Sequence, residues 1–544
     1  MTSKILICLV SALLNISYSF GQDNTNKGDS VPAQKYYNWF NLDPAQDKIA
    51  GISTDRAYEE LLKGKTLTRV VVAVIDGGVD INHQDLQGRI WVNKGEIPNN
   101  GIDDDGNGYI DDVNGWNFLG GPKGENIHKE TLEVTRLYKK YSEKYKTADT
   151  LHLTEQDLKE FNEYKTVRSD FLEKYNTAKS NNESLQAFGI AFNISDSIVF
   201  NILHKEDYTL KDIKRIKAGD NEQLAAVKDF LKGIYKKGFT RKDYFQYKDQ
   251  LFNQINYQYN TEYNPRTIVG DNPEVWSDTV YGNNDVVGGT GDHGTFVAGI
   301  IAAVRNNNLG IKGINDSVKI MSVRCVPDGD ERDKDVANAI IYAVNNGAQI
   351  LNLSFGKTYS PQKQFVDSAL KLAQLKGVLI VHAAGNDAKD VDEFQFYPQK
   401  YEDGTVIMDN WINVGASSQK PNKELPATFS NYGKKNVDLF APGDNICSTW
   451  PNSKYYVADG TSFASPMVAG AAALLKSAYP SLTAAQLKEI LMKSSHKYPT
   501  LRVYLPKKET DQKKMIVEFS SLSITGGVLN VYDALKMAEQ YIRK

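Results

Sequence analysis

The chain has 544 residues, of which 41% are hydrophobic and 24% are charged, and its formal net charge at pH 7 is −3. This composition is typical of globular proteins, and the small negative charge argues against nucleic-acid binding as the main function. The length allows more than one folded unit. Beyond residue 22 only Cys325 and Cys447 remain, too few for a disulfide framework, so we expect both to be small buried apolar residues.

Residues 1–22 have the pattern of an export signal. Lys4 supplies a positive charge, residues 5–14 form an apolar run, and small residues precede Gln22. A membrane anchor would need a longer apolar stretch, and we expect no other segment to be long and apolar enough to cross a bilayer. The sequence therefore predicts a cleaved leader, export to the periplasm or the extracellular space, and no membrane attachment after signal removal.

The first strong strand signal is the β-branched run at 69–75, which is followed by Asp76 and two glycines. A continuous apolar run of this kind predicts a strand that is covered on both faces of a parallel sheet. Asp76 then lies at the carboxyl end of the strand, the edge at which α/β sheets place ligands and chemistry. The alternative is that Asp76 merely begins a turn before Gly77 and Gly78.

An acidic, glycine-rich loop follows at residues 100–112. Its oxygen-bearing side chains match the first nine positions of an EF-hand calcium loop, but Asn114 stands where that loop has a glutamate. The alternative is a loop held only by side-chain hydrogen bonds to its own backbone. We predict a structural calcium ion and no organic cofactor, with Asp112 replacing the glutamate and these ligands: Asp103, Asp105, Asn107, the carbonyl of Tyr109, Asp111 and Asp112.

Between residues 124 and 281 the strand pattern disappears, and long segments rich in Lys, Glu and Tyr with helical spacing replace it. Helix start signals lie at 154–157 and 240–243, where a threonine is followed three residues later by an aspartate. We interpret residues 125–280 as an inserted helical subdomain whose mixed charges form a solvated surface.

The sheet pattern returns after residue 289 with His293, which is surrounded by small residues and precedes an apolar helix. Strands and helices then alternate, as in a doubly wound, mainly parallel α/β sheet flanked by helices. The expected strands are 319–326, 348–354, 378–383, 411–416 and 437–440, and the expected helices are 334–346, 361–375 and 483–494.

Two more polar residues fall where this pattern places the same sheet edge. Asn386 follows the strand 378–383 and is either a turn residue or a side-chain donor for an acyl-transfer site. Ser462 opens an Ala- and Gly-rich helix, and we expect Pro466 to lie among the first N–H groups, which lack a partner inside a helix. A hydroxyl at that position lies in a field that favours negative charge, although Ser462 could equally be a simple N-cap.

Serine is a weak nucleophile until a base accepts its proton and a carboxylate orients that base. Ser462, His293 and Asp76 provide these three groups. Their order along the chain, Asp then His then Ser, is the order of the triad in subtilisin. This match comes from comparison with that known example, since the spacing of the three residues does not predict it. The chain resembles the subtilisin-like serine proteases, the subtilases, in four blocks that follow that family's order: VIDGG at 74–78, DHGTFVAG at 292–299, AAGN at 383–386 and GTSFASP at 460–466.

The resemblance implies a secreted serine endopeptidase that acts on polypeptide substrates through an acyl-enzyme intermediate. In that case Ser462 is the nucleophile, His293 the general base, and Asp76 the group that orients the imidazole. Asn386 and the backbone N–H of Ser462 would hold the oxyanion. The alternative is a peptide-binding scaffold that keeps the fold without the chemistry.

The resemblance also implies a substrate-binding strand at Ser354, Phe355 and Gly356, which pairs with the substrate backbone. Gly385 would lie near the pocket for the residue that precedes the scissile bond. The chain departs from the family at several neighbouring positions, because Phe463 stands where the family often has methionine and Phe296 and Met467 where it often has histidine.

The resulting domain organisation is a signal peptide at 1–22, an N-terminal segment at 23–46, and a catalytic domain in two parts at 47–124 and 281–544, separated by the insertion at 125–280. No separate inhibitory propeptide domain is recognisable. Both ends of the insertion are joined to the predicted catalytic sheet, so we favour a lid that restricts substrates. An internal substitute for the propeptide and plain structural padding are the alternatives.

Overall fold

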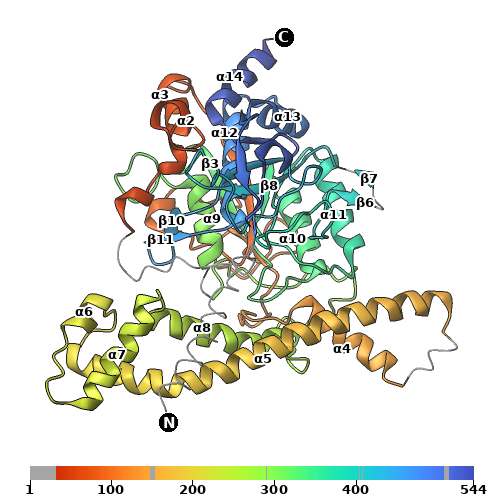
Figure 1. Cartoon of the computed structure of the whole chain (residues 1–544). Coiled ribbons are helices and arrows are strands. Elements are labelled where there is room, and N and C mark those ends of the chain that lie inside the picture. The colour runs from red at the N-terminus through yellow and green to blue at the C-terminus, as the bar shows by residue number, and fades with distance from the viewer. Residues whose placement is uncertain are drawn as a thin grey trace. The chain divides into compact units, whose positions relative to one another are not determined.

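The computed structural model describes residues 32–147, 153–289, 291–402, 405–406, 408–507 and 514–543, so the predicted leader lies outside the described residues. The chain divides into two compact units (Figure 1). Val134–Tyr263 form a helical unit, and the described residues up to Glu133 form a larger unit with those from Asn264 onward.

The larger unit is built on a nine-stranded sheet with the strand order β12-β15-β9-β8-β5-β4-β1-β3-β2. Every neighbouring pair in this sheet is parallel except β12 with β15, so the predicted doubly wound, mainly parallel sheet is confirmed. The strands are β1 (Val70–Asp76), β2 (Gly115–Asn117), β3 (Val318–Arg324), β4 (Ile350–Leu353), β5 (Leu379–Ala383), β8 (Trp411–Ser417), β9 (Leu439–Pro442), β12 (His496–Lys497) and β15 (Gly527–Val528).

Helices cover both faces of the sheet, which explains the continuous apolar run of β1. Val70, Val72 and Val74 belong to one buried cluster, while Ala73 and Ile75 belong to a second cluster on the other face. The first face carries α9 (Asp292–Ala302), α12 (Thr461–Ala478), α13 (Ala484–Ser494) and α14 (Val531–Ile542), and the second carries α10 (Asp333–Asn345) and α11 (Lys363–Leu375).

Smaller elements surround this sheet. Cys325 and Cys447 are both free and buried, as predicted from the sequence. The smaller elements are α2 (Pro44–Asp47), α3 (Thr54–Glu60), and the two-stranded pairs β6 (Tyr401–Glu402) with β7 (Thr405–Val406), β10 (Ile446–Trp450) with β11 (Lys454–Ala458), and β13 (Arg502–Tyr504) with β14 (Ile516–Glu518).

The start of α12 differs from the prediction at Pro466. The helix begins at Thr461, so Ser462 lies in its first turn and Pro466 lies inside the helix, beyond the four N–H groups that lack helical partners. A proline there leaves the carbonyl four residues earlier without its helical donor. That carbonyl belongs to Ser462, and it accepts a hydrogen bond from Ser354 Oγ at 2.8 Å instead. The proline thus frees a backbone acceptor that joins α12 to the segment after β4.

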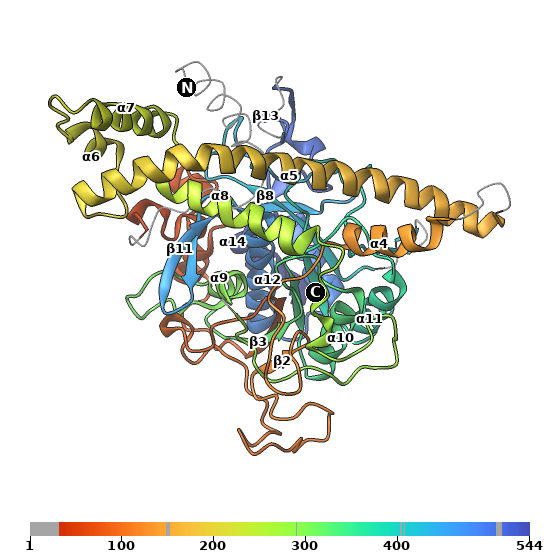
Figure 2. The ribbon, with the colours of Figure 1, turned by 90° about the horizontal axis from the view of Figure 1, so that it is seen from below.

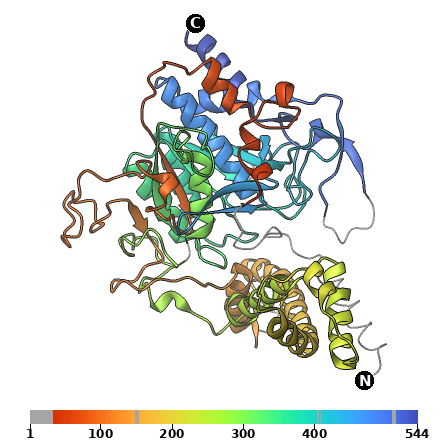
Figure 3. The ribbon, with the colours of Figure 1, turned by 90° about the vertical axis from the view of Figure 1, so that its left-hand side faces the viewer.

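The helical unit consists of α4 (Glu133–Tyr145), α5 (Glu155–Leu203), α6 (Leu210–Arg215), α7 (Glu222–Lys236) and α8 (Arg241–Asn253). The 49-residue α5 runs through the unit as one long rod (Figure 2), which Figure 3 views nearly end-on, and α7 and α8 pack against it. The predicted start signals are confirmed, because Thr154 Oγ1 accepts from the N–H of Asp157 and Thr240 forms a capping box with Asp243.

The apolar character of α5 corrects one sequence expectation. By length and composition α5 could cross a membrane, since one 18-residue window has a mean hydropathy of 1.2, whereas no such segment was expected beyond the leader. The buried residues of α5 serve the core of the helical unit: the rings of Phe192 and Tyr244 stack with their centroids 4.2 Å apart. We interpret α5 as the core helix of this unit.

Candidate active site

Asp76 and His293 meet at the carboxyl edge of the sheet. Asp76 ends β1 with its side chain 3% exposed, and His293 is the second residue of α9 with its side chain 39% exposed. His293 Nδ1 lies 2.8 Å from Asp76 Oδ1 and 2.9 Å from Oδ2. This contact favours the tautomer in which Nδ1 carries the proton and Nε2 carries the lone pair that can accept one.

The close approach of α9 to the end of β1 depends on a glycine after the histidine. A Cβ on Gly294 would collide with the carbonyl oxygen of Gly78 and would lie 3.3 Å from Cβ of Asp76. The backbone of α9 therefore touches the turn that follows Asp76, and this contact sets the height of His293 beside the carboxylate. This packing explains Gly294, whereas Gly78 lies against the carbonyl oxygen of Val287 and has a φ of +122°.

Ser462 lies on the neighbouring helix α12. Its Oγ donates to the carbonyl oxygen of Ser354 at 3.1 Å, and its own carbonyl oxygen accepts a hydrogen bond from the hydroxyl of Ser354 at 2.8 Å. The next residue, Phe463, packs on α9, with its ring centroid 5.7 Å from that of His293 and 4.2 Å from that of Phe296. Phe463 thus joins the start of α12 to the start of α9.

Asn386 follows β5, and Thr461 determines the orientation of its amide. Asn386 Oδ1 accepts from Thr461 N at 2.8 Å and from Thr461 Oγ1 at 2.9 Å. No acceptor contacts Asn386 Nδ2 among the residues that the structure describes. Thr461 Oγ1 also accepts from the N–H of Gly385 at 3.1 Å. Sequence reasoning missed Thr461, although a hydroxyl directly before the proposed nucleophile was a visible signal.

The segment Ser354–Gly356 continues from β4 and is held from behind. His382, which is buried in β5, contacts the carbonyl oxygen of Phe355 through Nε2 at 3.0 Å. Lys357 pairs with Tyr397 through both backbone groups, at 2.8 and 3.0 Å. These contacts fix the carbonyl of Phe355 and the residue that follows Gly356. Sequence reasoning missed His382 and Lys357, because both act through residues far away in the chain.

The acidic loop divides the predicted calcium ligands into two groups. The carboxylate of Asp103 accepts from the N–H groups of Asn107 and Gly108, and that of Asp111 accepts from the N–H groups at residues 100 and 101. The side chain of Asn107 donates to Asp112 at 3.1 Å, while its own oxygen accepts from the N–H of Tyr109 at 2.8 Å. These contacts hold the turns of the loop.

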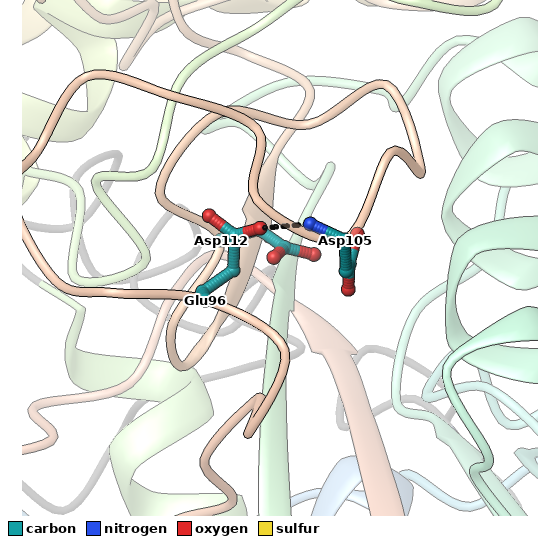
Figure 4. A group of neighbouring side chains, drawn as sticks. All are labelled: Glu96, Asp105 and Asp112. Carbon is teal, nitrogen blue, oxygen red and sulfur yellow. Dashed lines mark hydrogen bonds between the residues drawn. The ribbon is translucent and has the colours of Figure 1, made fainter.

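Asp105 and Asp112 meet a carboxylate that the sequence analysis did not include, Glu96 (Figure 4). One oxygen of each of the three lies within 4.8 Å of the others. Burial raises the pKa of Asp112 to about 6. Three carboxylates so close together repel one another, and hard oxygen ligands are the donors that calcium prefers. The residues present therefore fit a calcium ion, with Glu96 as the additional ligand.

Comparison with known proteins decides the family. The sequence model of the subtilase family matches residues 68–516. The chain belongs to the subtilase family. This subtilase is 37% identical over 213 residues to subtilisin BL of Lederbergia lenta, a match that covers 39% of the chain and 73% of that protein. It is 42% identical over 187 residues to the thermophilic serine proteinase of Bacillus sp. (strain AK1), covering 34% of the chain and 43% of that protein.

Among solved structures, the chain matches one described as the structural basis of subtilase cytotoxin SubAB assembly. The sequences are 28% identical, the match covers 46% of this chain and 78% of that one, and the TM-score is 0.38. Family membership and the subtilisin relatives establish that this subtilase is a serine-type endopeptidase, whose substrates are polypeptides.

The buried His382 makes the stability of this subtilase sensitive to acid. Its Nδ1 faces Asn413 Oδ1 at 3.0 Å, and burial lowers its pKa from 6.5 to about 4. In the unfolded chain the imidazole of His382 takes up a second ring proton near pH 6.5, whereas in the folded chain it does so only near pH 4. The folded state therefore loses stability as the pH falls through 6.5 towards 4, by about 2 kcal/mol between pH 7 and pH 5.

Urea unfolding at pH 7 and pH 5 measures this loss. His382→Gln keeps a donor for Phe355 but cannot be protonated, so the free energy of unfolding of this variant should fall by about 2 kcal/mol less than that of the wild type over the same interval. His496, which is partly exposed, supplies the matched control in His496→Gln. Equal acid sensitivity of His382→Gln and wild type would show that His382 is not responsible.

Proposed function

We propose that this subtilase hydrolyses peptide bonds with Ser462 as the nucleophile. The observation that carries the proposal is the contact of His293 Nδ1 with the buried carboxylate of Asp76 at 2.8 Å, beside the helix start that bears Ser462. With Nδ1–H held by Asp76, His293 Nε2 takes the proton of Ser462 Oγ as the oxygen attacks the substrate carbonyl. His293 then gives this proton to the leaving amine, and an acyl-enzyme forms. Water repeats the sequence and releases the acid.

The negative charge of the tetrahedral intermediate needs donors that are already in position. Asn386 Nδ2 is one candidate, because Thr461 occupies the oxygen of the same amide. The N–H of Ser462 is the second, because it belongs to the first turn of α12 and has no partner inside the helix. The positive end of the α12 dipole adds to this stabilisation.

Labelling with a fluorophosphonate tests the proposal directly. Such a probe phosphonylates an activated serine, so mass spectrometry of the digested protein should find one adduct, on Ser462. Ser465 lies on the next turn of α12 with its hydroxyl bonded to Asn352 at 2.9 Å, and it should stay unmodified. An adduct on another serine, or hydrolysis that survives without any adduct, would refute the assignment. Peptide binding without labelling or hydrolysis would support the scaffold alternative.

We also propose that this subtilase is exported and that residues 1–22 are the leader. Support comes from the charge of Lys4 and the apolar run at residues 5–14. Expression in a bacterial host with an export pathway should give a mature protein in the periplasm or medium whose N-terminus begins after residue 22. N-terminal sequencing checks this expectation, and a protein that leaves the cytoplasm with Met1 in place would contradict cleavage.

Calcium at the cluster of Glu96, Asp105 and Asp112 is proposed as a structural ion. A ligand that binds only the folded state stabilises it by about 2.7 kcal/mol when present at a hundred times its Kd. Removing calcium with a chelator should therefore lower the Tm by several degrees. Asp105→Asn should abolish most of that response, whereas Asp409→Asn, on the exposed surface, should retain it. A Tm that is unchanged by chelation of protein shown to contain calcium would refute the site.

A further inference from the structure

The proposed mechanism determines where the residue that supplies the scissile carbonyl, the acyl residue, must lie. Its carbonyl carbon bonds to Ser462 Oγ, which contacts the backbone of Ser354 at 3.1 Å, and its oxygen points to Asn386. The acyl residue therefore lies between the segment Ser354–Gly356 and the segment that ends in Gly385 and Asn386. Its side chain has to enter the space beside these two segments. The inference that follows rests on this proposed function.

Both segments present a glycine to that space, and the ring of Phe396 lies against the two glycines. A Cβ on Gly356 would be 2.5 Å from both Cε1 and Cζ of Phe396. A Cβ on Gly385 would be 3.2 Å from Cζ and 3.3 Å from Cε1 of the same ring, and would also collide with Asn431. The far end of the phenyl ring therefore occupies the space that side chains at these two positions would otherwise take.

The backbone of Phe396 is anchored on the same side as the substrate-binding segment. The next residue, Tyr397, exchanges two backbone hydrogen bonds with Lys357, which follows Gly356 directly. The ammonium of Lys357 is buried against Glu133 at 2.8 Å and Asp333 at 2.9 Å. These contacts fix the backbone from which the ring of Phe396 extends towards the two glycines.

The ring itself is packed from behind. Its centroid lies 5.8 Å from that of His382, and His382 in turn contacts the carbonyl of Phe355 and the ring of Trp411. The ring is partly buried and held by these contacts on one side, and forcing extra atoms against packed side chains costs about 1–3 kcal/mol. A large side chain of a substrate would have to bear that cost, while a hydrogen or methyl group would not.

We propose that Phe396 closes the pocket for the side chain of the acyl residue, so that this subtilase cleaves after small residues: glycine, alanine and serine. Aromatic and long aliphatic residues are rejected because their atoms overlap the ring. A steric difference of this size corresponds to roughly ten- to hundredfold in kcat/KM. Phe396 is thus the residue that determines specificity at this position.

The test compares two peptides that differ only in the acyl residue, alanine in one and phenylalanine in the other. The wild type should cleave the alanine peptide with a kcat/KM at least ten times higher. Phe396→Ala opens the pocket and should shift this ratio by ten- to hundredfold towards phenylalanine. Phe394→Ala is the matched control: it removes a ring two residues earlier that packs over Lys389, 3.7 Å from Nζ to the ring centroid, and should leave the ratio unchanged.

Two results would overturn the proposal. One is a wild type that cleaves after phenylalanine as efficiently as after alanine, which decides the matter even if Phe396→Ala fails to fold. The other is an unchanged ratio in a Phe396→Ala protein that still reacts with the fluorophosphonate at Ser462. Failure of the proposed mechanism looks different, since hydrolysis would then persist in Ser462→Ala whatever residue precedes the scissile bond.

Discussion

Replacing Ser462 with alanine should lower kcat for peptide hydrolysis by roughly a million-fold, the size known for loss of the triad serine in subtilisin and not one obtained from the distances here. The variant retains the carboxylate, the imidazole and the oxyanion donors but has no atom that can form the acyl-enzyme. Residual hydrolysis should resemble direct attack by water on a carbonyl held by Asn386 and the helix start. The measurement is peptide hydrolysis at saturating substrate, with fluorophosphonate titration to exclude contaminating protease.

Ser465→Ala is the matched control for this experiment. Ser465 is a buried serine of the same helix, and its hydroxyl donates to Asn352 Oδ1 at 2.9 Å, away from the proposed reaction. Loss of this hydrogen bond should cost about 1 kcal/mol of stability and change kcat by less than tenfold. Equal hydrolysis by Ser462→Ala and wild type would refute the assignment. Because the three residues of a triad act as a unit, adding His293→Ala to Ser462→Ala should change the rate little, and a further million-fold loss would contradict this expectation.

The main strands and the sheet edge could be predicted because their signals are local. The β-branched run of β1 and the alternation of strands and helices after His293 follow from rules that apply to short windows of sequence. The histidine beside glycine and the serine before an Ala- and Gly-rich helix stand out for the same reason. The assignment of Asp76 to the same site came from family resemblance, since more than two hundred residues separate it from His293.

The supporting residues could not be predicted, because their roles arise from contacts between distant parts of the chain. Glu96 joins Asp105 and Asp112 only through the fold of the loop, and nothing in its local sequence marks it as a ligand. His382 reads as part of an apolar strand, yet it fixes the carbonyl of Phe355. Pro466 looked like a residue of the first turn because the helix start was placed too late; the bond from Ser354 Oγ compensates for its interior position.

Replacing Arg266 with methionine should destabilise the larger unit by about 3–5 kcal/mol. Arg266 lies on the stretch that returns from the helical unit, and its guanidinium makes two hydrogen bonds to Asp335 of α10, at 2.6 and 2.7 Å. Its side chain is 4% exposed and that of Asp335 is 0% exposed. Without the arginine, the buried carboxylate of Asp335 keeps the hydroxyl of Tyr281 at 2.6 Å but loses the cation that compensates its charge.

The expected loss of stability comes from the buried carboxylate of Asp335 that is left without a cation. A double variant separates this effect from the loss of the arginine itself. Arg266→Met combined with Asp335→Leu removes the arginine and one of its two buried carboxylate partners, while the other partner, Asp271, keeps Lys334 at 2.8 Å. The double variant should recover much of the lost stability, because apolar residues can replace a buried ion pair at little cost. Lys493→Met, which breaks the exposed pair with Glu489, is the control for loss of an ion pair as such and should cost less than about 1 kcal/mol. Urea unfolding followed by tryptophan fluorescence gives the three free energies. A double variant that is less stable than Arg266→Met would contradict this explanation, because Asp335 would then stabilise the fold even without the arginine.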